Sequence, residues 1–154
     1  MKSLSSVLFA LVLTSVASVA AASDPVTIPE RLQGAERVVV ATVASVTATF
    51  EQNAYGDQII VSHLTLSVEE TLKGAPAALL TVDVEGGTVG GVSLEVASLP
   101  RMKTGERAVF FLEKDGTAYV PHLRGQGILK LNAQDVVKGS SLTLDAIRTM
   151  ASAQ

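Results

Sequence analysis

The chain of 154 residues carries 12 lysine and arginine residues against 15 aspartate and glutamate residues, so its formal net charge is −3 at pH 7. An acidic surface does not attract nucleic acid or an anionic membrane, and an aromatic content of 4% without tryptophan offers little surface on which bases can stack. The absence of cysteine excludes disulfide, thiol and iron–sulfur chemistry.

The first residues have the layout of a secretory signal peptide. Lys2 precedes an apolar run over residues 4–16, and three alanines at 20–22 then offer the small side chains that signal peptidase requires. The run is shorter than the roughly 20 apolar residues of a membrane-spanning helix. We therefore predict a cleaved signal peptide over residues 1–22, export to the periplasm or the medium, and no membrane attachment after cleavage.

The remainder, residues 23–154, is predicted to form one domain that opens with a short helix and a long strand. Thr27 is a suitable N-cap for the helix, and Gly34 is a suitable end. Residues 37–50 are rich in valine and threonine, whose β-branched side chains favour a strand.

The next segment, residues 58–72, alternates between two faces, as a half-buried antiparallel strand does. One face carries Ile60, Leu64, Leu66, Val68 and Leu72, and the other carries Ile59, Val61, His63, Thr65 and Glu69. This strand and the one before it are about 14 residues each, longer than the usual strand of about 5–6 residues.

Shorter strands follow, separated by glycine and proline residues. The strand at 79–85 is predicted to point Leu80, Val82 and Val84 inward and Thr81, Asp83 and Glu85 outward. Further predictions are a strand at 92–96, a hairpin over 107–123 that turns at Asp115 and Gly116, a short strand within 125–132, and a C-terminal helix capped by Thr143.

The segment RAVFFL, residues 107–112, is apolar on both faces, so its outer face needs a cover. The predicted C-terminal helix can supply this cover through Leu144, Ile147 and Met150, and the alternative is a partner molecule. The aromatic side chains are predicted to pack in the core or in hairpins; they are Phe50, Tyr55, Phe110, Phe111 and Tyr119.

Several short strands with turn residues between them indicate an all-β fold. Two long opening strands that contribute to both sides of a closed sheet are typical of an OB-fold. We therefore predict a small antiparallel Greek-key barrel of the OB-fold type, with a short N-terminal helical turn and a C-terminal helix.

Two glycine pairs, Gly86-Gly87 and Gly90-Gly91, interrupt the strands in the segment EGGTVGGVSLEV. A phosphate-binding loop would run directly into a helix, whereas a strand pattern follows here, and the nearest lysine is Lys103. Glycines between strands permit positive φ, a bulge or a close approach of two backbones. We interpret the four glycines as structural.

Four segments within residues 36–131, ERVVVATVASV, VEETLKG, GGVSLEV and GERAVFFL, resemble the OB-fold of the netrin-like and tissue-inhibitor-of-metalloproteinases group. They are also similar to small exported bacterial proteins of unassigned function. The resemblance implies an OB-fold and, by analogy, recognition of a protease. The zinc-chelating N-terminal cysteine of those inhibitors has no counterpart in this chain.

The candidate catalytic groups are few. His63 and His122 are the only histidines, and no serine lies in a G-x-S-x-G motif. Asp83 and Glu85 share one face of a strand, where paired carboxylates serve acid–base chemistry or bind calcium in some proteins. We interpret both histidines as structural and both carboxylates as solvated, and we predict no metal and no cofactor.

The sequence thus favours a non-enzymatic module that binds another exported protein, conceivably a protease. The predicted contact is the glycine-rich connection and the start of the following strand, which comprise Thr88, Val89, Gly90, Gly91 and Val92. The alternative is a metal- or ligand-binding enzyme that uses His63, His122, Asp83 and Glu85.

Overall fold

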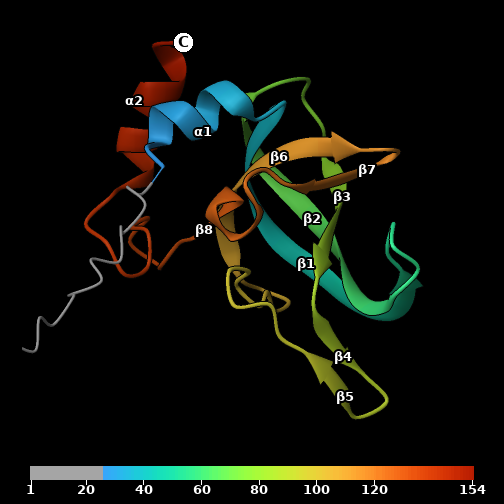
Figure 1. Cartoon of the computed structure of the whole chain (residues 1–154). Helices are drawn as coiled ribbons and strands as arrows, with labels where there is room; N and C mark the ends of the chain where they lie inside the picture. Colours follow the sequence, from blue (N-terminus) through green and yellow to red (C-terminus); the bar gives the residue numbers. More distant parts are fainter. Residues whose placement is uncertain (1–25) are drawn as a thin grey trace, which may run out of the picture.

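The structure, a computed structural model, describes residues 26–154 (Figure 1). The predicted signal peptide, residues 1–22, lies outside the described residues. The elements follow in the order α1 (Ile28–Gly34), β1 (Arg37–Gln52), β2 (Gln58–Lys73), β3 (Leu79–Glu85), β4 (Gly87–Val89), β5 (Val92–Leu94), β6 (Arg107–Asp115), β7 (Ala118–Pro121), the 3₁₀ turn η1 (Arg124–Gly127), β8 (Ile128–Lys130) and α2 (Leu144–Ser152). The fold is therefore mostly β, as predicted.

A long hairpin of β1 and β2 forms the frame of the fold. Each strand has 16 residues, and the Asn53 side chain closes the turn between them by accepting hydrogen bonds from the backbone N–H groups of Tyr55 and Asp57. The pairing register shifts three times near the open end of the hairpin, which is the mark of β-bulges and bends the strands. These shifts change which face a residue occupies. Leu72 accordingly packs in a different core cluster from Leu64, contrary to the predicted alternation.

The strand pairings form a closed circuit. β2 pairs with β3, β3 pairs in parallel with β7, β7 pairs with β6, and β6 pairs with β1, so that β1 has a partner on each side. β8 extends the sheet beyond β6. The result is one closely packed sheet of six strands with two helices, α1 and α2, at one end (Figure 1).

Strand β6 takes part in two separate clusters of buried side chains. Ala108, Phe110 and Leu112 belong to the cluster inside the circuit, and Val109 and Phe111 belong to the cluster beneath the helices. Leu144 and Ile147 are buried in the second cluster and Met150 packs against it, so the prediction that the C-terminal helix covers RAVFFL is confirmed. Helix α1 also covers β6, because its Leu32 joins the same cluster, and this cover is not among the predictions.

The aromatic side chains lie in the core or in hairpins, as predicted, but two of those in the β1–β2 hairpin keep much of their surface exposed. Phe110 and Phe111 are fully buried, whereas Phe50 is 44% exposed and Tyr55 is 91% exposed. Tyr55 lies in the tight turn between β1 and β2. Phe50 lies near the turn end of β1, directly opposite Ile60 of β2.

The glycine-rich segment folds into a second, small hairpin that projects from the opposite end to the helices (Figure 1). Val89 pairs with Val92, and Gly90 and Gly91 between them have φ angles of +55° and +82°. Two successive positive φ angles are what a two-residue type I′ turn requires, which explains the second glycine pair. Strand β5 ends at Leu94, so the predicted strand at 92–96 is too long at its C-terminal end.

The first glycine pair has a different structural role. A Cβ atom on Gly87 would lie 2.6 Å from Ser62 Oγ and 3.1 Å from Ala48 Cβ, and Gly87 has a φ angle of +142°. The close approach of β4 to the long hairpin therefore needs a residue without a side chain. The structural interpretation of these glycines is confirmed. Among residues 26–154, no helix is long and apolar enough to cross a membrane.

Candidate functional site

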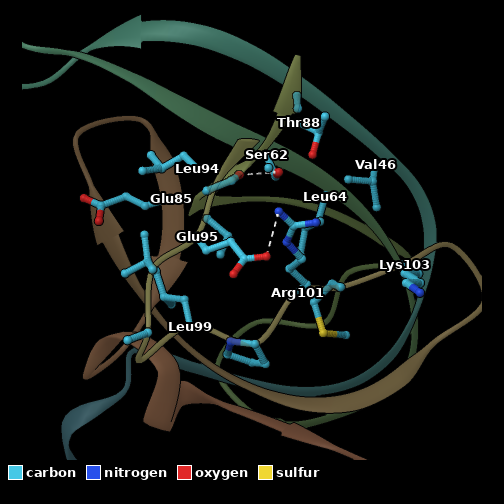
Figure 2. Close-up of a pocket in the computed structure, with 18 residues that line it drawn as sticks. Val46, Ser62, Leu64, Glu85, Thr88, Leu94, Glu95, Leu99, Arg101 and Lys103 are labelled. Atoms are coloured by element: carbon cyan, nitrogen blue, oxygen red, sulfur yellow. Dashed lines mark hydrogen bonds and ion pairs between the residues drawn. The ribbon is translucent and has the colours of Figure 1, made fainter. Parts of the chain in front are cut away.

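A pocket of about 510 Å³ opens between the long hairpin, the small hairpin β4–β5 and the segment at residues 95–103 (Figure 2). Its floor is the end of the core cluster inside the circuit, because Leu64, Val84 and Met102 belong both to that cluster and to the pocket lining. Val46 and Leu99, which pack against the same cluster, complete the apolar surface. The pocket therefore has an apolar interior that reaches the core.

The segment at 95–103 forms one wall of the pocket and is held by contacts with distant parts of the chain. A Cβ atom on Gly125 would overlap the carbonyl of Ser98, so this wall passes directly over η1. Lys130 Nζ donates a hydrogen bond to the carbonyl oxygen of Arg101. On the opposite side, Ser62 Oγ donates to the carbonyl oxygen of Gly86 at 2.6 Å and fixes the start of the small hairpin.

An ion pair within the 95–103 wall lines the pocket (Figure 2). Arg101 Nη2 is 3.3 Å from Glu95 Oε1, and the two side chains are 49% and 79% exposed. An exposed pair of this kind contributes little to stability, because water screens both charges. The Arg101 guanidinium is therefore available to another carboxylate at little cost.

The five residues predicted to contact a partner lie together in the small hairpin. Thr88 also lines the pocket, and its Oγ1 is 2.8 Å from Ser93 Oγ across the hairpin. Gly90, Gly91 and Val92 are exposed at the turn, where Val92 keeps 56% of its surface in solvent. Within residues 26–154, β4 and β5 pair only with each other, so each strand has a free edge.

His63 lies in a polar cluster on the other face of the long hairpin. Its Nδ1 is 2.6 Å from Asp83 Oδ1, and its Nε2 is 2.7 Å from Glu51 Oε1 and 3.1 Å from Thr49 Oγ1. The register of three neighbouring strands brings these groups together, since Thr47, His63 and Asp83 are directly opposite one another.

The order hydroxyl, imidazole, carboxylate in this cluster resembles that of a catalytic triad. A second carboxylate, Glu51, sits at the ring nitrogen that would have to accept the proton of Thr49. The hydrogen bond to Asp83 raises the pKa of His63 above its ordinary value of 6.5, and both carboxylates add to the effect. Both ring nitrogens of His63 already face carboxylates, which favour the protonated ring, so the cluster is better suited to joining three strands than to general-base catalysis.

The raised pKa gives a testable pH dependence. An NMR titration of the ring protons should place the pKa of His63 above 6.5, and Asp83→Asn should lower it. Protonated His63 stabilises the fold fully below the unfolded pKa, and this contribution is lost as the pH rises through the folded pKa. The difference in melting temperature between the natural chain and His63→Gln should therefore shrink with rising pH. A difference that grows with pH would contradict the ion-pair assignment.

The other residues of the predicted enzyme site have partners of their own. His122 Nδ1 is 2.5 Å from Glu113 Oε2, and its ring packs against Gly34 of α1. Glu85 pairs with Arg124. Asp83, Glu85 and His122 do line a common pocket of about 310 Å³, but His63 does not line it.

The acidic and histidine side chains are the candidate metal ligands of the chain. In the part of the chain that the structure describes, no three of them gather in a way that could hold a metal ion. Asp83 and Glu85 do share one face of β3, as predicted, but each carboxylate is turned to a different cation, His63 and Arg124.

Sequence reasoning did not identify the larger pocket or its ion pair. Glu95 falls within the predicted strand at 92–96, whereas in the structure it follows β5, which ends at Leu94. Comparison with known proteins adds no assignment, since no family model matches the chain and no curated protein matches it.

Proposed function

We propose that this chain is an exported, non-enzymatic binding module that recognises another exported protein through the small hairpin β4–β5. The observation that carries the proposal is the free edge on each strand of a hairpin that projects from the molecule (Figure 1). An extended segment of a partner can pair with such an edge, and main-chain hydrogen bonds then supply affinity. The exposed side chain of Val92 offers an apolar contact beside that edge.

We also infer that the six-stranded sheet is a barrel of the OB-fold type with Greek-key connections. Support comes from the closed circuit β1-β2-β3-β7-β6, in which five strands return to the first. The resemblance to the netrin-like and inhibitor group agrees with this arrangement, and a protease is therefore one class of partner to test. The zinc-chelating step of those inhibitors is not part of the proposal, because the chain has no cysteine.

The test is capture of a partner from exported proteins, followed by loss of capture in a hairpin variant. Val92→Asp places a charge at the free edge and should abolish capture. Leu79→Asp is the matched control, because Leu79 is also an exposed aliphatic residue, 64% exposed at the start of β3, and this variant should capture normally. Equal capture by Val92→Asp and the natural chain would show that the partner does not bind at the small hairpin.

The alternative function is an enzyme that uses the histidines, and the Thr49–His63–Asp83 contacts are the observation in its favour. The same purified chains distinguish the enzyme from the binding module. If the module proposal is right, replacement of both His63 and His122 by alanine leaves capture unchanged. Stoichiometric zinc or calcium in the purified chain, lost in that double variant, would instead favour the alternative.

A further inference from the structure

The larger pocket is bordered by the small hairpin and shares Thr88 with it, but its chemistry points to a ligand of its own. We propose that it binds a small amphipathic molecule with an aliphatic chain and a single carboxylate, which Arg101 receives. This inference does not depend on the proposed protein recognition, because the residues that carry it lie on the pocket floor and on the 95–103 wall.

The interior of the pocket favours an alkyl chain over a polar ligand. Its volume, about 510 Å³, is in the range of small-molecule sites. Its floor is formed by Leu64, Val84 and Met102, each less than 10% exposed. The two hydroxyl groups of the lining, on Ser62 and Thr88, already have hydrogen-bond partners. Ser62 Oγ has already donated its proton to the carbonyl of Gly86, so it has no donor left for the oxygen atoms of a sugar or a nucleotide, whereas an alkyl chain needs no partner.

The charge at the pocket mouth selects the head group. Glu95 occupies the position beside Arg101 that a ligand carboxylate would take, and exchange of one carboxylate for the other keeps the guanidinium neutralised. Lys103 also lines the pocket and adds a second cation to Arg101, while Glu85 is paired with Arg124, which lies outside the lining. These two cations favour an anionic head group, and Glu95 beside Arg101 disfavours the second charge of a dianionic phosphate. A single carboxylate is the head group that fits both conditions.

Decanoate, used below its micelle concentration, is the probe, and decanol is its neutral counterpart. In a methyl NMR titration of the purified chain, decanoate should shift the signals of Leu64, Val84 and Met102. Arg101→Gln should weaken decanoate binding by about tenfold, as expected for the loss of a charge-assisted hydrogen bond, and leave decanol binding unchanged. Glu95→Gln should strengthen decanoate binding, because it removes the internal competitor.

Two controls keep the result specific. Arg148→Gln removes a guanidinium that pairs with Glu70 and Asp145, and none of these three residues lines this pocket, so it should bind decanoate normally. Val92→Asp should also bind decanoate normally, which separates this inference from the hairpin proposal. Equal affinity for decanoate and decanol, or equal decanoate binding by Arg101→Gln and the natural chain, would overturn the inference.

The carboxylate has two sources, a free fatty acid or the C-terminus of a peptide. A tetrapeptide that ends in leucine, compared with its amide, tests the second source in the same titration. Binding of either the acid or the peptide that depends on Arg101 supports the inference and identifies the source. Failure of both to shift the floor methyl groups refutes it.

Discussion

Phe111→Ala is expected to lower the free energy of unfolding by about 3–5 kcal/mol, the usual cost of removing a fully buried phenylalanine. The side chain is 0% exposed and packs in the cluster between β6 and the two helices, where it shares neighbours with Leu144 and Ile147. A rigid cover of this kind does not collapse easily into the space that the ring leaves. Urea denaturation followed by circular dichroism measures the loss.

The chain contains a matched control for this variant. Phe50→Ala removes the same side chain from a site that is 44% exposed, and its cost should be less than about 1 kcal/mol. Equal losses for the two variants would mean that helices α1 and α2 do not cover β6 in solution as they do in the structure.

Gly87→Ala is expected to cost about 2–5 kcal/mol, because it adds backbone strain to overpacking. The new Cβ would meet Ser62 Oγ at 2.6 Å, and φ of +142° is unfavourable for any residue with a side chain. Gly91→Ala separates the two causes. Gly91 also has a positive φ, but its Cβ would meet nothing within 4 Å, so its cost should be only about 1–2 kcal/mol.

The same denaturation experiment compares the two glycine variants. A cost for Gly87→Ala no greater than that for Gly91→Ala would show that β4 does not approach the long hairpin closely. The small hairpin would then be free to move relative to the pocket that it borders.

Local patterns were sufficient to predict most elements of the fold. The β-branched runs became β1 and β2, and Thr27 caps α1 in a capping box with Glu30. The two-sided apolar pattern of RAVFFL correctly indicated a cover on each face. Each of these features depends on residues that are close together in the sequence, so it can be recognised from the sequence of a single chain.

The errors arise where distant segments meet. The exposure of Phe50 depends on what other segments lie over that end of the long hairpin, and the packing of Leu72 depends on bulges in the pairing with β1. The alternation of apolar and polar residues within one strand shows neither how far other segments cover that strand nor where a bulge falls.

The candidate site was predictable only in its local part. The turn at Gly90 and Gly91 carries its own signal, since paired glycines favour a two-residue hairpin turn. The pocket depends instead on Ser98 lying over Gly125, and the His63 cluster depends on the register of three strands. Such contacts follow from the assembled fold and leave no local pattern.

Hydrogen–deuterium exchange of the chain, alone and saturated with the protein that it captures, tests the central claim most directly. Pairing of a partner segment with the small hairpin would protect the backbone amides on a free edge of residues 87–94. We predict slower exchange there and unchanged exchange around His63. Unchanged exchange at 87–94, with protection confined to the strands around His63 and Asp83, would contradict recognition through the hairpin.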